Sequence, residues 1–154
     1  AEKNKAFMDS LNRQGKYEIT SDMKEKLADF YGGFATEEET LGQIRKLYKD
    51  TGYVIDTHTA VASFVYEQYR NASKDDTKTI IASTASPFKF ARNVMAAIED
   101  GKLSDNDFEL CDTLSKLSNV AVPKAVEELK TADIKHKDVI EIDEMKASIL
   151  EFLS

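Results

Sequence analysis

The fold of this sequence is decided by the stretch Thr79-Ile-Ile-Ala-Ser-Thr-Ala-Ser-Pro-Phe-Lys-Phe90. Its first four residues are typical of a buried β-strand. Small hydroxyl residues follow, and Ser86-Pro87 then opens a helix, because proline suits the first helical position. The stretch therefore predicts a strand that ends in small polar side chains and leads directly into a helix N-terminus.

This strand-to-helix edge, near residues 79–90, is a candidate ligand site. In open α/β sheets, ligands lie beyond the carboxyl ends of strands, where the free N–H groups of helices point. Ser83, Thr84 and Ser86 offer hydroxyl groups there, and Lys89 lies in the first helical turn. Such an edge suits an anionic ligand or one with a ring nitrogen. The alternative is that Ser86 only caps the helix and the residues before it form an ordinary turn.

A second strand-to-helix junction lies in residues 52–62. Asp56 and His58 are two positions apart there, and they could serve acid–base chemistry or contact a substrate. The alternative is that Asp56 or Thr57 caps the helix while His58 is a half-exposed residue of its first turn. With two histidines in the whole sequence, we expect no metal site.

Helical patterns dominate the rest of the chain. Thr36 and Glu39 have the spacing of a capping box, and Gly52 is placed to end the helix that follows. Apolar stripes predict six or seven helices from residue 20 onward, but strands only near residues 52–56, 79–82 and 139–142. An independent α/β domain would show more strands in regular alternation. The expected fold class is therefore α/β, as a predominantly helical fragment with two or three short strands, and residues 1–154 are expected to be a single segment of a larger protein.

Composition and charge exclude several classes of partner. The chain has 21 basic and 28 acidic residues and a net charge of −7, and its bases are scattered, which argues against nucleic acid. The apolar runs are too short to cross a membrane. A single cysteine, Cys111, excludes an intrachain disulfide and fits a cytoplasmic location. A fragment of this kind is expected to self-associate through exposed apolar surface.

The two junctions resemble a known family. Residues 51–62, Thr-Gly-Tyr-Val-Ile-Asp-Thr-His-Thr-Ala-Val-Ala, and residues 82–90, Ala-Ser-Thr-Ala-Ser-Pro-Phe-Lys-Phe, resemble the C-terminal part of threonine synthase. That family comprises pyridoxal-phosphate enzymes of fold type II, the tryptophan-synthase-β-like fold, and the resemblance extends over nearly the whole chain. The family often has proline where Thr57 stands and histidine where Ser86 stands.

The resemblance implies a lyase that converts O-phosphohomoserine and water to threonine and phosphate in threonine biosynthesis. Thr84, with Ser83 beside it, would match the hydroxyl that hydrogen-bonds the pyridine nitrogen of pyridoxal phosphate. A neutral partner leaves that nitrogen unprotonated, which makes the ring a weaker electron sink. Lys89, His58 and Asp56 would lie near the substrate or its phosphate. The Schiff-base lysine is expected upstream, so we expect no catalytic residue in this C-terminal segment and no activity from it alone.

Two other interpretations stay open. A stand-alone helical interaction module without catalytic activity would explain the surplus of helices over strands. A related pyridoxal-phosphate enzyme such as threonine dehydratase is the closer rival, and the stretch His58-Thr-Ala-Val-Ala62 disfavours it.

Overall fold

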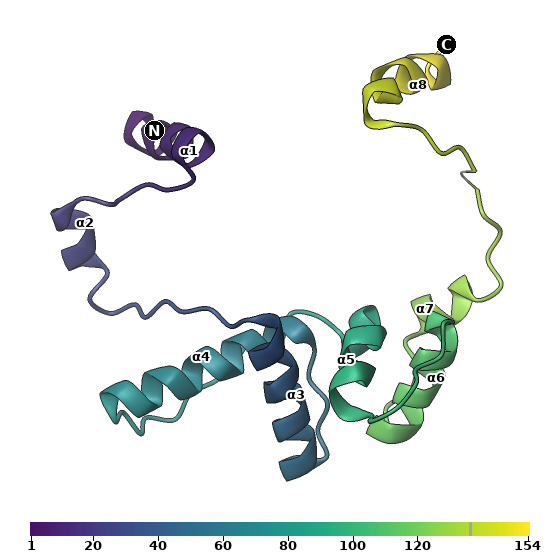
Figure 1. The fold of residues 1–154 in the computed structure, drawn as a ribbon, viewed down its shortest axis with the longest axis horizontal. Coiled ribbons are helices and arrows are strands. Elements are labelled where there is room, and N and C mark those ends of the chain that lie inside the picture. The colour runs from purple at the N-terminus through teal and green to yellow at the C-terminus, as the bar shows by residue number, and fades with distance from the viewer. Residues whose placement is uncertain (136) are drawn as a thin grey trace. The chain divides into compact units, whose positions relative to one another are not determined.

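The computed structural model describes residues 1–135 and 137–154. They divide into two compact units, Ala1–Leu103 and Ser104–Ser154. All the regular structure of the described residues is helical (Figure 1). We predicted that the whole chain is a single C-terminal segment of a larger enzyme. This concerns the complete enzyme and stays a prediction.

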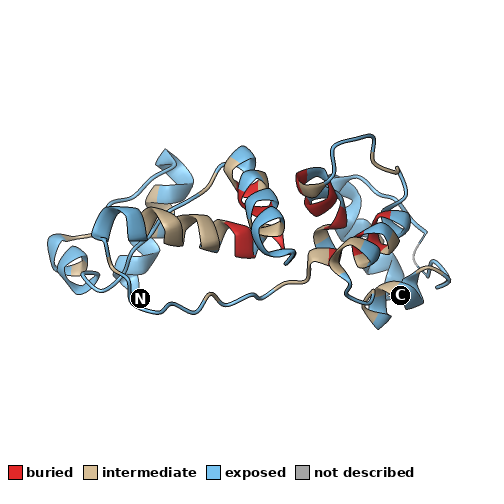
Figure 2. Ribbon diagram, turned by 90° about the horizontal axis from the view of Figure 1, so that it is seen from below, coloured by how far each residue is buried: buried red, intermediate tan, exposed pale blue. Residues whose placement is uncertain are grey.

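Three helices build the core of the first unit. Its elements are α1 (Glu2–Gln14), α2 (Ser21–Lys26), α3 (Glu37–Thr51), α4 (Thr57–Ser73), the 3₁₀ helix η1 (Pro87–Phe90) and α5 (Ala91–Ile98). Helix α3 packs against both α4 and α5, whereas α1 and α2 bury no residue. Figure 2 shows the buried positions in red. In this unit the buried apolar side chains are Ile44, Val54, Ile55, Ala60, Phe88, Ala91, Val94, Met95 and Ala97.

Local sequence signals fix where α3 ends and α4 begins. Helix α3 starts with the predicted capping box, in which the Glu39 N–H donates to Thr36 Oγ1 and the Thr36 N–H donates to the Glu39 carboxylate. It ends at Gly52, whose φ of 74° is left-handed and therefore favours glycine. Helix α4 begins directly after Asp56, the residue that caps it. The connection between the two helices is short and partly buried, which holds the start of α4 against the core.

The predicted strands are wrong for the chain as described. Residues 53–56 form an irregular connection, and residues 79–82 belong to no helix or sheet. No hydrogen bond joins the backbone of residues 78–85 to that of another described segment, and the side chain of Ile80 is 96% exposed. Residues 139–141 are likewise irregular, with Val139 also 96% exposed. A strand needs a neighbour to pair its N–H and C=O groups, and the described residues offer none.

The second unit is smaller and less buried. Its elements are α6 (Asp107–Ser118), α7 (Lys124–Leu129), the 3₁₀ helix η2 (Ile142–Glu144) and α8 (Met145–Phe152). Helix α6 buries Leu110, Cys111 and Leu114, whereas α8 buries no residue. Burial raises the pKa of the Cys111 thiol, which disfavours the reactive thiolate. Among the helices described, none has the length and hydropathy needed to span a membrane.

Candidate functional site

The N-terminus of α4 is built around a buried carboxylate. Asp56 is fully buried, and its Oδ1 accepts hydrogen bonds from the backbone N–H groups of His58, at 2.8 Å, and Thr59, at 3.3 Å. These are two of the N–H groups that every helix leaves without a partner in its first turn. The negative charge also faces the positive end of the helix dipole. The alternative in which Asp56 caps the helix is thus confirmed.

The second oxygen of Asp56 reaches a distant part of the chain. The Thr59 hydroxyl donates to Asp56 Oδ2, and Ser83 Oγ lies 2.9 Å from Thr59 Oγ1 and 3.5 Å from Asp56 Oδ2. An ionised carboxylate only accepts hydrogen bonds, so the protons run from Ser83 towards Thr59 and Asp56. The structure therefore brings two predicted site residues, Asp56 and Ser83, into one network.

The environment of Asp56 favours its ionised form. Burial by itself would raise the pKa of this carboxyl group. The hydrogen bonds from the Thr59 hydroxyl and from the backbone N–H groups of His58 and Thr59 outweigh burial and lower the pKa. Asp56 is therefore a structural anion with no free oxygen facing solvent, and it has no access to a substrate in this structure.

His58 occupies the exposed side of the same helix start. Its side chain is 64% exposed, its Nδ1 lies 3.3 Å from Asp56 Oδ1, and its ring centroid lies 4.9 Å from that of Phe90. A cavity of about 360 Å³ opens beside it, lined by Ala35, Glu37, Thr40, Leu41, Thr57, Val61, Phe90 and Asn93 as well as His58. His58 can therefore meet a small polar ligand, which Asp56 cannot.

Of the predicted site residues that follow residues 79–82, some make hydrogen bonds within the protein and others are exposed. Ser86 caps η1 by accepting from the Phe88 N–H at 3.3 Å, as its alternative interpretation predicted. Thr84 is exposed, and its hydroxyl has no hydrogen-bond partner among the described residues. Lys89 is also exposed, with Nζ 5.4 Å from the Phe90 ring centroid. Thr84 and Lys89 are thus the groups that remain available to a ligand.

Thr59 is the member of the network that the sequence analysis missed. Its hydroxyl links Asp56 to Ser83, although the sequence places these residues 27 positions apart. The available signal was a hydroxyl residue three positions after a helix-capping aspartate, where it can reach the carboxylate of the cap. The described residues contain no group of three or more histidine, cysteine or acidic side chains placed to hold a metal ion.

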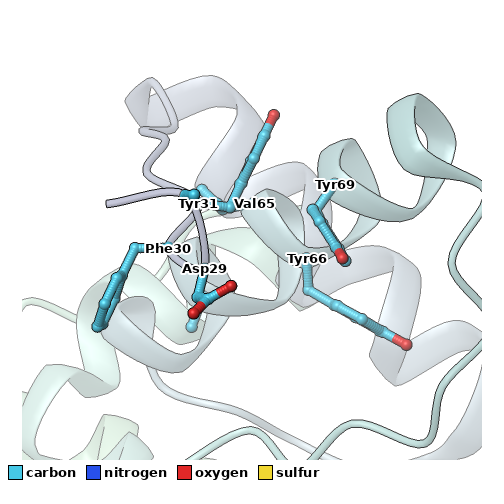
Figure 3. Close-up of a pocket in the computed structure, with 8 residues that line it drawn as sticks. Asp29, Phe30, Tyr31, Val65, Tyr66 and Tyr69 are labelled. Carbon is cyan, nitrogen blue, oxygen red and sulfur yellow. The ribbon is translucent and has the colours of Figure 1, made fainter. Parts of the chain in front are cut away.

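A second cavity, of about 650 Å³, lies further along α4, beside Ala62 to Tyr69 (Figure 3). Its walls are the segment before α3 and the side chains of α4, namely Ala28, Asp29, Phe30, Tyr31, Ala62, Val65, Tyr66 and Tyr69. The rings of Tyr31 and Tyr69 are tilted against each other with centroids 5.2 Å apart. The Tyr69 hydroxyl donates to Asp75 at 2.8 Å. This aromatic surface holds the segment onto α4 and presents no pair of groups suited to acid–base chemistry.

Gly33 is where that segment lies closest to α4, so a methyl group there is expected to destabilise the contact. A Cβ atom at this position would lie 2.8 Å from Val65 Cγ1, and a β-branched side chain on a helix has little freedom to move away. We expect Gly33→Ala to lower the free energy of unfolding of the first unit by about 1–2 kcal/mol in urea titrations. Gly32→Ala is the matched control, since no atom lies within 4 Å of its added Cβ. Equal effects of the two substitutions would contradict the close approach.

Comparisons with known proteins agree with one another. The family model described as "Threonine synthase, C-terminal" matches residues 59–140. Threonine synthase-like 1 from Pongo abelii is 34% identical over 96 residues, which cover 62% of this chain and 12% of that protein. The Homo sapiens protein of the same name is 33% identical over 96 residues, with the same coverage. Threonine synthase from Schizosaccharomyces pombe is 32% identical over 104 residues, covering 66% of this chain and 20% of that protein.

Proposed function

Since this chain belongs to the threonine synthase C-terminal family, we propose that it is the C-terminal part of a pyridoxal-phosphate-dependent lyase. The proposed enzyme has fold type II and works in the cytoplasm, where it converts O-phosphohomoserine and water to threonine and phosphate. The chain spans only 12–20% of the length of the curated relatives it matches. The lysine that carries the cofactor is therefore proposed to lie in the remainder of the enzyme, and the chain alone to be inactive.

The observation that carries this proposal is the exposed hydroxyl of Thr84. The turn that contains it, residues 82–86, has hydroxyl and methyl side chains and no charged group. Asp56 is the carboxylate nearest to Ser83 in the network, and its oxygens are engaged by capping, by the Thr59 and Ser83 hydroxyls and by His58 Nδ1. The donor set is therefore neutral, and it fits a pyridine nitrogen that stays unprotonated. When bound, pyridoxal phosphate supplies an electron sink for charge that develops at the substrate's α-carbon.

Two exposed side chains are proposed to face the substrate. Lys89 carries a compact positive charge, which suits a phosphate group. His58 lines the cavity beside α4, where its imidazole can hydrogen-bond a polar group of the substrate. Both lie next to the ring of Phe90, which gives them a common neighbour. Asp56 contributes by fixing the first turn of α4 that carries His58.

The exposed apolar residues support the proposal that the remainder of the enzyme covers part of this chain. Ile80 and Val139 are each 96% exposed, and Phe152 at the C-terminal helix is 82% exposed. In the proposed enzyme, Ile80 and its neighbours add to a sheet formed by the remainder of the protein, and the isolated chain self-associates through such surfaces. The same exposure is the observation that favours the second candidate, a helical interaction module whose apolar surface binds a partner without catalysis.

The proposal is tested by comparing the full-length protein that carries this chain with the 154-residue chain alone. With pyridoxal phosphate and O-phosphohomoserine, we expect the full-length protein to release phosphate and threonine in equal amounts, and the chain alone to release neither. Borohydride is expected to fix the cofactor to one lysine outside the chain. A full-length protein that forms no threonine would contradict the lyase, and a stoichiometric adduct on one lysine of the isolated chain would contradict the division of roles.

A further inference from the structure

Asp56 has a structural position that capping alone does not account for. One of its oxygens is enough to cap α4, since Oδ1 receives both backbone N–H groups. The other oxygen, Oδ2, is directed to the hydroxyls of Thr59 and Ser83. The fully buried carboxylate thus ties the start of α4 to a segment that lies 27 residues further along the chain.

The segment that receives this tie has little else to hold it. Residues 79–85 belong to no helix or strand, and their backbone makes no hydrogen bond to that of another described segment. The next fixed points on its C-terminal side are the Ser86 cap and the buried ring of Phe88. The hydrogen bonding of Ser83 therefore fixes the course of the chain between Ser83 and Ser86.

The network also distinguishes the two adjacent hydroxyls. Both side chains are exposed, but Ser83 bonds to Thr59 and Asp56, whereas Thr84 has no hydrogen-bond partner among the described residues. The proton of Ser83 is committed to the network, whereas the proton of Thr84 is available.

We propose that Asp56 and Thr59 are positioning residues that engage the hydroxyl of Ser83 and thereby present the hydroxyl of Thr84, and not that of Ser83, to a ring nitrogen. The identity of that ring, the pyridine of pyridoxal phosphate, rests on the proposed function. The anchoring of Ser83 does not, because it is a property of this chain alone. Ser83, expected from the sequence to contact the cofactor beside Thr84, is thereby assigned to the anchor.

The anchor is tested in the 154-residue chain with a matched pair of substitutions. Thr59→Val keeps the shape of the side chain and removes its hydroxyl, whereas Thr59→Ser keeps the hydroxyl. We expect amide hydrogen exchange of Phe88 and Lys89, whose N–H groups are bonded to Ser86, to become about tenfold faster in Thr59→Val and in Ser83→Ala, which is the size of a lost hydrogen bond to a charged network. Thr59→Ser is expected to stay within about twofold of the unchanged chain. Exchange that is the same in Thr59→Val and Thr59→Ser would overturn the anchor.

The presentation of Thr84 is tested in the full-length protein with pyridoxal phosphate labelled with ¹⁵N in its ring. We expect Thr84→Val to move the ¹⁵N resonance of the bound ring, because it removes the group in contact with the nitrogen. Thr59→Val and Ser83→Ala are expected to weaken cofactor binding by about tenfold but to leave the resonance of the bound fraction unchanged. A purely structural role for Thr59 would not separate affinity from the nitrogen signal in this way.

The outcomes distinguish this inference from the proposed function. A resonance that moves in Ser83→Ala as far as in Thr84→Val would overturn the assignment of Ser83 to the anchor, with the lyase still standing. A full-length protein that binds no pyridoxal phosphate would overturn the proposed function together with the ring nitrogen. In that case the exchange measurements on the isolated chain still decide whether Asp56 and Thr59 position the turn.

Discussion

Replacing Asp56 by alanine is expected to lower the free energy of unfolding of the Ala1–Leu103 unit by about 3 kcal/mol. Loss of an N-cap side chain costs about 1 kcal/mol. The substitution also leaves the buried hydroxyl of Thr59 without its acceptor, and a buried polar group without a partner costs a further 1–3 kcal/mol or so. Urea titration of the isolated chain, followed by far-ultraviolet circular dichroism, measures the sum.

Thr36→Ala is the matched control for this prediction. Thr36 caps α3 as Asp56 caps α4, but it is exposed and its hydrogen bonds stay within its own capping box and first turn. We therefore expect the control to lower the free energy of unfolding by about 1 kcal/mol only. Equal losses in the two variants would show that Asp56 acts as an ordinary cap and that its bonds to distant residues contribute nothing.

The pH dependence of stability follows from the lowered pKa of Asp56. An unfolded aspartate titrates near pH ~3.9, and the folded pKa lies below that value. The stabilisation that ionised Asp56 provides is therefore complete above the unfolded pKa and is lost as the pH falls through the folded pKa. In urea titrations from pH 7 down to 3, the unchanged chain should lose more of its stability than Asp56→Asn, which cannot titrate. If the difference in the free energy of unfolding between the two proteins stayed constant across this range, that would contradict the lowered pKa of Asp56.

Replacing Thr84 by valine in the full-length enzyme is expected to reduce kcat for phosphate release from O-phosphohomoserine by about 100-fold. Removal of one pre-positioned hydrogen-bond donor at a reacting group typically has an effect of this size. Valine keeps the branched shape, so the loss reports the hydroxyl alone. The KM for O-phosphohomoserine should change by less than about threefold, because Thr84 is proposed to contact the cofactor ring and not the substrate.

Thr79→Val is the matched control for the Thr84 substitution. It makes the same chemical change five residues earlier, at an exposed position whose hydroxyl only donates to the backbone carbonyl of Thr77. We expect its kcat to stay within about twofold of the unchanged enzyme. A Thr84→Val enzyme with the kinetics of this control would remove Thr84 from the site.

The caps of α3, α4 and η1 are the part of this structure that the sequence predicted, because each is decided by neighbours within one turn. Thr36, Ser86 and one of the two candidates at the start of α4 all cap as expected. Helix α1 was missed although Gly15 ends it in a left-handed conformation. Its apolar residues are only Ala6, Phe7, Met8 and Leu11, and none of them is buried.

Strands and the hydrogen-bond network could not be predicted in the same way, because both depend on residues far apart in sequence. The run around Ile80 has the composition of a strand, but composition does not supply a neighbour to pair with. The role of Thr59 depends on Ser83, 24 positions away. Nothing local to either residue indicates that they meet. Which of the two adjacent hydroxyls joins the network could therefore not be predicted from the sequence.

The hydrogen bond between Thr59 and Ser83 makes these two positions a single unit for anyone who diversifies this protein. A library that randomises one of them at a time keeps the other hydroxyl as a donor to Asp56 Oδ2. Joint replacement by two apolar residues removes both donors from this buried carboxylate oxygen and is expected to be tolerated worse than either single change. Screens of this region should therefore sample the pair together.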